Sequence, residues 1–147
     1  MKLRVAVIYG GRSGEHEVSL RSAKSIIDAM DPEKYKVIHY VISKAGKWSP
    51  RPIAPEPRGN PEIDVVFPVL HGTFGEDGTV QGLLDLAELP YVGAGLLASA
   101  VSMDKEVMKR LLQERGLPVV EYVVHRRGTG LETCSTYPLF VKPANLG

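Results

Sequence analysis

Apolar segments of strand length alternate with segments of helical spacing over much of this sequence. Residues 3–9 are nearly all apolar and rich in β-branched side chains, as in a strand that is buried on both faces. Residues 17–30 follow with apolar side chains at helical spacing, and residues 35–42 and 63–70 form further apolar segments. Strands that alternate with helices form parallel βαβ units with right-handed crossovers. We therefore predict a doubly wound α/β domain with a parallel sheet.

The connections between these segments complete the predicted domain. Residues 44–61 are rich in proline, glycine and charge, and we expect a surface excursion there. Pro68 is expected to mark the end of regular strand pairing. A helix is predicted over 79–88, and a short fourth strand at 91–92. The substrate-binding α/β domain is therefore assigned to residues 1–97.

The sequence changes character in its last third. A helix is predicted over 103–115, with Gly116 in the left-handed cap position. The side chains expected to be buried on this helix are Val107, Met108, Leu111 and Leu112. Two strands, 119–125 and 137–142, are expected to form a hairpin through a polar connection that contains glycine. A hairpin and one helix are not a self-sufficient domain, so residues 98–147 are interpreted as the beginning of a second, incomplete domain.

Bulk properties exclude several classes of partner. The formal net charge of +1 gives no electrostatic reason to expect nucleic acid or anionic lipid. No apolar run of about 18 residues is present, so no membrane span is expected. The first residues do not have the pattern of a secretory signal. Cys134 is the single cysteine, which excludes an intrachain disulfide and fits a reducing cytoplasm.

Two glycine-rich loops follow predicted strands. GGRSGEHE follows the first strand and contains Glu15, and HGTFGEDG follows the third strand and contains His71, Glu76 and Asp77. The carboxyl ends of parallel strands meet at one edge of the sheet, which is where ligands bind in open α/β sheets. We therefore expect these side chains to line one cleft.

Structural alternatives remain open for these loops. The glycine spacing G-G-x-x-G matches neither the dinucleotide fingerprint nor the phosphate-binding P-loop. Glu15 is equally consistent with an acidic residue that stabilises a helix N-terminus. His71, Glu76 and Asp77 are also consistent with ordinary turn residues. One histidine and two acids at this spacing do not form a recognised metal site, so no metal ligand is assigned.

Two lysines stand in unusual positions. Lys105 lies in the first turn of the predicted helix, where the helix dipole disfavours a cation, so an anionic ligand nearby is favoured. Lys142 ends the apolar segment YPLFVKP. It is placed either to reach into a site or to extend into solvent.

Four segments together resemble the D-alanine–D-alanine ligases of the ATP-grasp family. They are GGRSGEHEVSL, VVFPVLHGTFGEDGTVQGLL, LPYVGAGLLASAVSMDK and FVKPANLG. The resemblance covers residues 5–147 except 44–60. It implies an N-terminal pre-ATP-grasp domain followed by the start of an α+β ATP-grasp domain. It also implies ATP-dependent ligation of two D-alanines through an acylphosphate, for peptidoglycan precursor synthesis.

The resemblance implies roles for individual residues. Glu15 matches the catalytic glutamate that binds the ammonium group of the first D-alanine, and Val18 and Ser19 match residues close to that substrate. His71 matches a histidine near the substrate carboxylate, which it would orient by donating a hydrogen bond. Lys105 and Lys142 match two lysines that contact ATP. Lysine suits this role because its ammonium is a compact point charge.

The resemblance also implies features outside the chain. Family members are longer, and the Mg²⁺ ligands and other catalytic groups are expected beyond residue 147. The chain alone is therefore expected to be inactive. A homodimer and a cytoplasmic location are implied as well.

Three alternatives are kept. The first is a non-catalytic amino-acid-binding module that retains the Glu15 loop. The second is a nucleotide-binding redox domain, which the missing G-x-G-x-x-G pattern disfavours. The third is a ligase relative that joins D-alanine to D-lactate or D-serine.

Overall fold

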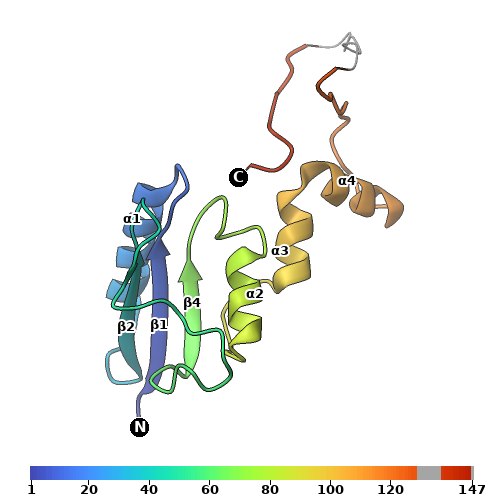
Figure 1. Ribbon diagram of the computed structural model, residues 1–147. Helices are drawn as coiled ribbons and strands as arrows, with labels where there is room; N and C mark the ends of the chain where they lie inside the picture. Colours follow the sequence, from blue (N-terminus) through green and yellow to red (C-terminus); the bar gives the residue numbers. More distant parts are fainter. Residues whose placement is uncertain (129–136, 147) are drawn as a thin grey trace.

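A four-stranded sheet forms the body of the protein (Figure 1). The computed structural model describes residues 1–128 and 137–146. β1 (Leu3–Gly10) pairs in parallel with β2 (Tyr35–Ile42) on one side and with β4 (Val65–Val69) on the other. The short β3 (Trp48–Ser49) pairs antiparallel with the outer edge of β2. The predicted parallel sheet is thus confirmed, with the order β3-β2-β1-β4.

One helix covers each face of the sheet. α1 (His16–Ala29) packs against the face that carries Val5 and Val7, and α2 (Thr79–Leu86) packs against the face that carries Ala6 and Ile8. Successive side chains of a strand point to opposite faces, so a strand between two helices must be apolar throughout. This is why residues 3–9 form a continuous apolar run. The doubly wound arrangement is confirmed.

The excursion over 44–61 is more ordered than its composition predicts. Besides β3, it contributes Ile53 to the core on the α2 face, where this side chain is almost fully buried. The side chain of Asn60 is also buried, and it bonds both the N–H and the carbonyl of Ala54, at 3.0 and 2.8 Å. These bonds satisfy the backbone of a segment that has little regular structure.

The prediction that strand pairing stops at Pro68 is wrong, because β4 continues to Val69. The N–H of Val66 donates to the carbonyl of Pro90, away from β1. The nitrogen of Pro68, two residues further, faces the same side of the strand. Proline therefore costs β4 no hydrogen bond to β1. The predicted fourth strand is a single parallel bridge between Val66 and Tyr91.

Two helices follow in the last third of the described chain. α3 (Leu96–Met103) was not predicted, and α4 (Lys105–Glu114) begins two residues after the predicted start. The side chain of Asp104 separates them, since it accepts hydrogen bonds from the N–H groups of Glu106 and Val107. α4 ends at Glu114, one residue before the predicted end, and Gly116 is left-handed as predicted, with a φ of 69°.

The predicted burial of Val107, Met108, Leu111 and Leu112 is wrong. α4 has no buried residue, and Val107 and Leu111 are 42% and 49% exposed. An amphipathic pattern shows that a helix has an apolar face but not that anything covers it. Here α4 packs against α3 and lies away from the sheet (Figure 1).

The predicted strands 119–125 and 137–142 are also absent, since no strand occurs in these described segments. Phe140 and Val141 are 86% and 90% exposed. A strand pattern yields a strand only where a pairing partner and an apolar surface exist, and neither is available here. Most of the predicted connection, 129–136, lies outside the described residues. None of the described helices has the length and apolarity needed to cross a membrane.

Candidate functional site

The turn after β1 is built for close backbone contact. Gly10 and Gly11 both have positive φ, and a Cβ atom on Gly10 would lie 2.2 Å from the carbonyl oxygen of Ile42. Only glycine fits such a position. The turn delivers Glu15 to the N-terminus of α1, where its N–H donates to the hydroxyl of Ser13 at 3.2 Å. The Glu15 side chain is half-buried.

The loop after β4 lies against this turn. The hydroxyl of Ser13 donates to the carbonyl of His71 at 2.7 Å. A Cβ atom on Gly72 would lie 2.7 Å from Oε2 of Glu15, so the backbone of Gly72 is next to this carboxylate. The structure therefore brings Glu15 and the His71 loop to the same edge of the sheet, where parallel topology places them.

The imidazole of His71 lies between a hydroxyl and a carboxylate. Its Nε2 is 3.1 Å from Oγ of Ser22, and its Nδ1 is 3.9 Å from Oε1 of Glu76. The second distance is too long for a hydrogen bond. The other carboxylate oxygen of Glu76 accepts the N–H of Gly72 at 2.8 Å. Nδ1 thus has no hydrogen-bond partner among the described residues.

Asp77 stabilises the loop itself. Its carboxylate accepts the N–H groups of Phe74 and Thr79 at 2.8 and 3.0 Å. Partial burial alone would raise the pKa of Asp77, but these hydrogen bonds outweigh it and lower the pKa below its ordinary value. Asp77 is therefore an ordinary turn residue that stabilises the loop, which is one of the alternatives left open by the sequence. Among the residues described, no group of three or more His, Cys, Asp or Glu is placed to hold a metal ion.

Val18 and Ser19 occupy different environments on α1. Ser19 is fully buried, and its hydroxyl accepts the N–H of Gly10 at 2.8 Å and donates to the carbonyl of Val69. It ties the end of β1 to the end of β4 beneath the loops. Val18 is 38% exposed.

Lys105 contacts the last described segment, 137–146, to which Lys142 belongs. The N–H of Lys105 donates to the carbonyl of Ala144 at 3.0 Å, and its ammonium donates to the carbonyl of Leu146. Nζ of Lys142 lies 4.9 Å from the centre of the Phe140 ring. Within the described part of the chain, no hydrogen bond or ion pair joins either lysine to the loops of Glu15 and His71.

Three residues at this edge were not identified from the sequence. They are Ser13, His16 and Ser22. His16 is 9% exposed, and its Nδ1 lies 2.7 Å from the carbonyl of Gly11, so it supports the glycine turn. Ser22 follows Glu15 by seven residues, which places both on one face of α1. That spacing was a usable signal, whereas nothing in the sequence pattern points to Ser13 or His16.

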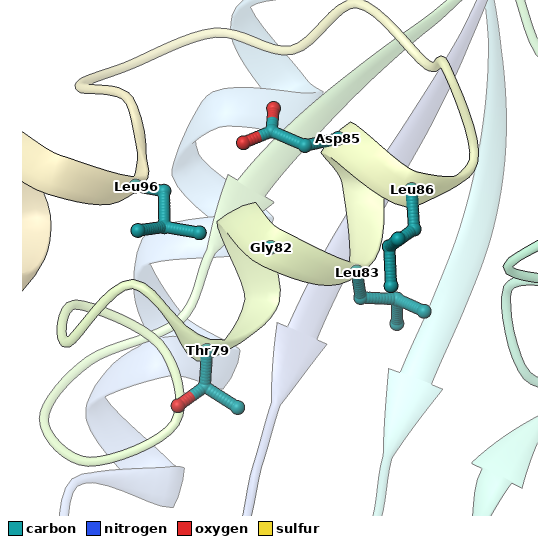
Figure 2. Close-up of a pocket in the computed structure, with 6 residues that line it drawn as sticks. All are labelled: Thr79, Gly82, Leu83, Asp85, Leu86 and Leu96. Carbon is teal, nitrogen blue, oxygen red and sulfur yellow. The ribbon is translucent and has the colours of Figure 1, made fainter.

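A cavity of about 220 Å³ lies beside His71. The guanidinium of Arg12 stacks over the ring of Phe74 at 4.3 Å, and both side chains line this cavity. A more open hollow of about 640 Å³ lies along α2 and the start of α3 (Figure 2). Its lining residues are Thr79, Gly82, Leu83, Asp85, Leu86 and Leu96. With no cation or histidine in that lining, the edge near Glu15 and His71 is the better candidate site.

The structure is a parallel α/β domain with an acidic group and a histidine on adjoining loops at the carboxyl edge of the sheet, where ligands bind in open α/β sheets. The sequence matches the family model "D-ala D-ala ligase N-terminus" over residues 4–60 and 54–94. The chain belongs to this family, and the resemblance stated from the sequence is confirmed.

Relatives and solved structures agree with this assignment. The chain is 68% identical to D-alanine–D-alanine ligase of Solibacter usitatus, over 100% of this chain and 46% of that protein. It is 39% identical to D-alanine–D-alanine ligase A of Escherichia coli K12, over 99% of this chain and 52% of that protein. It thus spans about half the length of these curated relatives.

The fold is that of the corresponding part of solved ligases. The D-alanine–D-alanine ligase from Coxiella burnetii is similar with a TM-score of 0.74 and 39% identity, over 82% of this chain and 43% of that one. The VanG D-Ala:D-Ser ligase from Enterococcus faecalis is similar with a TM-score of 0.76 and 32% identity, over 82% and 44%.

Proposed function

We propose that this chain is the part of an ATP-dependent D-alanine–D-alanine ligase that binds the first D-alanine. The complete protein would join two D-alanines through an acylphosphate, for peptidoglycan precursor synthesis. The observation that carries the proposal is the approach of Gly72 to the carboxylate of Glu15, with His71 next in the chain. The family and its relatives named D-alanine–D-alanine ligase support it.

The chemistry of these residues fits a small amino acid. The Glu15 carboxylate is half-buried and forms no ion pair with any described residue, so it is available to an ammonium group. Gly72 has no side chain to fill the space beside it. Nδ1 of His71 has no hydrogen-bond partner among described residues and can donate to the amino acid's carboxylate. In this proposal Glu15 is the catalytic residue, because it fixes the substrate whose carboxylate is phosphorylated.

The environment of Val18 and Ser19 supports an indirect role near this substrate. Ser19 acts by holding the ends of β1 and β4 in place, since its hydroxyl is already used by two backbone groups. Val18 remains exposed in the first turn of α1 after Glu15. We assign it to the wall of the site.

ATP is the proposed cofactor, with Lys105 and Lys142 on its phosphates. Both ammonium groups fit this role as compact cations, and Lys105 contacts the segment 137–146 that contains Lys142. ATP would supply the phosphoryl group that activates the carboxylate. Mg²⁺ is proposed as its companion ion, without ligands assigned in this chain. We propose that residues 1–97 form the substrate domain and that 98–147 begin the ATP-grasp domain.

The remaining properties are also proposals for the complete protein. We propose a cytoplasmic homodimer that acts on D-alanine and on neither nucleic acid nor membrane. The similarity to a D-Ala:D-Ser ligase keeps D-serine as an alternative second substrate, with D-lactate as a further one. A non-catalytic amino-acid-binding module would retain the same site. ATP-dependent phosphate release with D-alanine, by the protein that contains this chain, separates the ligase from such a module.

The first-substrate site is tested by calorimetric titration of D-alanine into the chain and its Glu15→Gln variant. A hydrogen bond to a charged group is worth about 1.5–3 kcal/mol, so we expect affinity to fall roughly 10- to 100-fold. Glu17→Gln is the control, because Glu17 pairs instead with Lys44 at 2.8 Å and is 65% exposed. Equal binding by the wild type and Glu15→Gln would rule out the proposed site.

A further inference from the structure

The hydroxyl of Ser22 contacts the imidazole of His71, a side chain that is distant in the sequence. Serine within a helix commonly bonds a carbonyl of the preceding turn. Oγ of Ser22 instead lies 3.1 Å from Nε2 of His71, which is 49 residues away in the sequence. Ser22 is half-buried on the face of α1 that also carries Glu15 and Ser19, seven and three residues earlier.

The direction of this hydrogen bond and the ring nitrogen of His71 that carries the proton are linked. A neutral imidazole carries its proton on one nitrogen and accepts at the other. If the hydroxyl of Ser22 donates to Nε2, the proton stays on Nδ1. The Glu76 carboxylate favours the same arrangement, because its Oε1 lies 3.9 Å from Nδ1 and a negative charge on that side of the ring stabilises an N–H there.

The backbone holds this arrangement in place. The carbonyl of His71 accepts from Ser13, and the N–H of Gly72 donates to Oε2 of Glu76, at 2.7 and 2.8 Å. Hydrogen bonds therefore fix the position of the His71 backbone and that of the Glu76 carboxylate. What remains free is the rotation of the ring and the location of its proton, and Ser22 is the side chain that contacts Nε2.

We propose that Ser22 is a positioning residue for the candidate site: its hydroxyl donates to Nε2 of His71 and keeps the imidazole proton on Nδ1, from where it is donated to the carboxylate of the bound amino acid. The role of the donor rests on the proposed function. The location of the imidazole proton does not rest on it, since it is inferred from contacts within the chain. The two parts are therefore tested separately.

The proton is located by ¹⁵N NMR of the imidazole side chains, at a pH where imidazoles are ordinarily neutral. The His71 signals are assigned by their loss in His71→Gln. We expect the wild type to have the protonated nitrogen at Nδ1 and the acceptor at Nε2. Ser22→Ala should shift the population toward the Nε2–H form that free imidazole side chains prefer in water. Ser22→Thr, which keeps the hydroxyl, should restore the wild-type pattern.

Ser25→Ala is the matched control, because Ser25 lies one turn further along α1 and is exposed. It should leave the His71 signals unchanged. Alanine favours helices over serine, so unfolding of α1 cannot account for an effect of Ser22→Ala. A wild-type proton on Nε2, or identical His71 signals in the wild type and Ser22→Ala, would overturn the proposal.

The link to the substrate is measured by D-alanine titration of the same variants. Loss of one neutral hydrogen bond predicts that Ser22→Ala weakens binding about 2- to 10-fold, with Ser22→Thr close to wild type. A changed proton position with unchanged affinity would overturn the link. No D-alanine binding by the wild type would instead reject the proposed function, while the NMR result would still decide the role of Ser22.

Discussion

Short polar side chains hold the carboxyl edge of the sheet together. Ser19 connects β1 to β4, and Ser13 connects the turn of Glu15 to the backbone of His71. Each uses one hydroxyl to satisfy backbone groups that the ends of strands leave unpaired. The geometry of the candidate site therefore depends on residues that need not touch a ligand.

Ser19→Ala should destabilise the fold by about 1–3 kcal/mol. The substitution removes two hydrogen bonds of a fully buried hydroxyl, so that the N–H of Gly10 loses its acceptor and the carbonyl of Val69 loses a donor. Urea unfolding of the chain measures this loss. Ser25→Ala, an exposed change on the same helix, should cost nothing measurable. If the two variants have equal unfolding free energies, the buried hydroxyl does not carry the role assigned to it.

Gly72→Ala should lower both the stability of the fold and the affinity for D-alanine. Gly72 has a φ of 70°, where a side chain costs about 1–2 kcal/mol, and its Cβ would lie 2.7 Å from Oε2 of Glu15. We expect the carboxylate to move and D-alanine binding to weaken beyond the loss of stability. Gly116→Ala is a matched control with a φ of 69° and nothing within 4 Å. Equal D-alanine affinities in the two variants would show that Gly72 serves the turn alone.

At the scale of elements, an ion pair between Arg4 and Asp64 joins the start of β1 to the residue before β4. The backbone N–H and Nε of Arg4 donate to Asp64 at 2.7 and 3.0 Å. Hydrogen bonds from the Arg4 side chain, followed by that from its backbone, lower the pKa of Asp64 from 3.8 to about 2. The ionised form of Asp64 is thus favoured by folding.

This lowered pKa predicts a pH dependence with a definite sign. Stability from the pair is fully present above the unfolded value of 3.8 and is lost as the pH falls toward about 2. Asp64→Asn should therefore flatten the dependence of unfolding free energy on pH between these values. Asp28→Asn, on the exposed face of α1, should leave it as in the wild type. Denaturant unfolding at a series of acidic pH values gives both curves, and parallel curves for wild type and Asp64→Asn would contradict the assignment.

The sequence predicted correctly those elements whose apolar side chains are buried against the core. β1, β2 and α1 were predictable because apolar side chains at the right period face a core on the sheet. α4 and the segments 119–125 and 137–142 have similar patterns but no surface that covers them. Periodicity reports which face is apolar, and tertiary contacts decide whether it is buried.

In the candidate site, too, the sequence predicted some features, whereas others depend on tertiary contacts. Parallel topology alone placed the loops of Glu15 and His71 at one edge of the sheet. The contact between Ser22 and His71 spans 49 residues and depends on ring orientation, which no local pattern encodes. The roles of Lys105 and Lys142 stay predictions, because their described contacts join them to residues 140–146 and not to the loops.

At the scale of the whole molecule, the chain divides into a packed body and an extension. Both core clusters lie in the body that the sheet, α1, α2 and their adjoining loops form, including Ile53 of the 44–61 excursion. α3 and α4 lead away from it, and residues 119–128 and 137–146 continue beyond α4 without regular structure. Their large apolar side chains are mostly exposed, including Val120 at 80% and Tyr137 at 79%. Such a surface is usually covered by further protein.

Hydrogen exchange of the intact chain tests this division directly. Amides of β1 are bonded in two parallel ladders and covered by helices on both faces, so they should exchange only on global unfolding. Amides of 119–128 and 137–146 lack a ladder and should exchange about as fast as an unfolded chain. α4 should be intermediate, because its helical bonds form but none of its side chains is buried. Protection of both segments equal to that of β1 would mean that they pair as strands in solution, as their sequence pattern predicts, and that an apolar surface covers them.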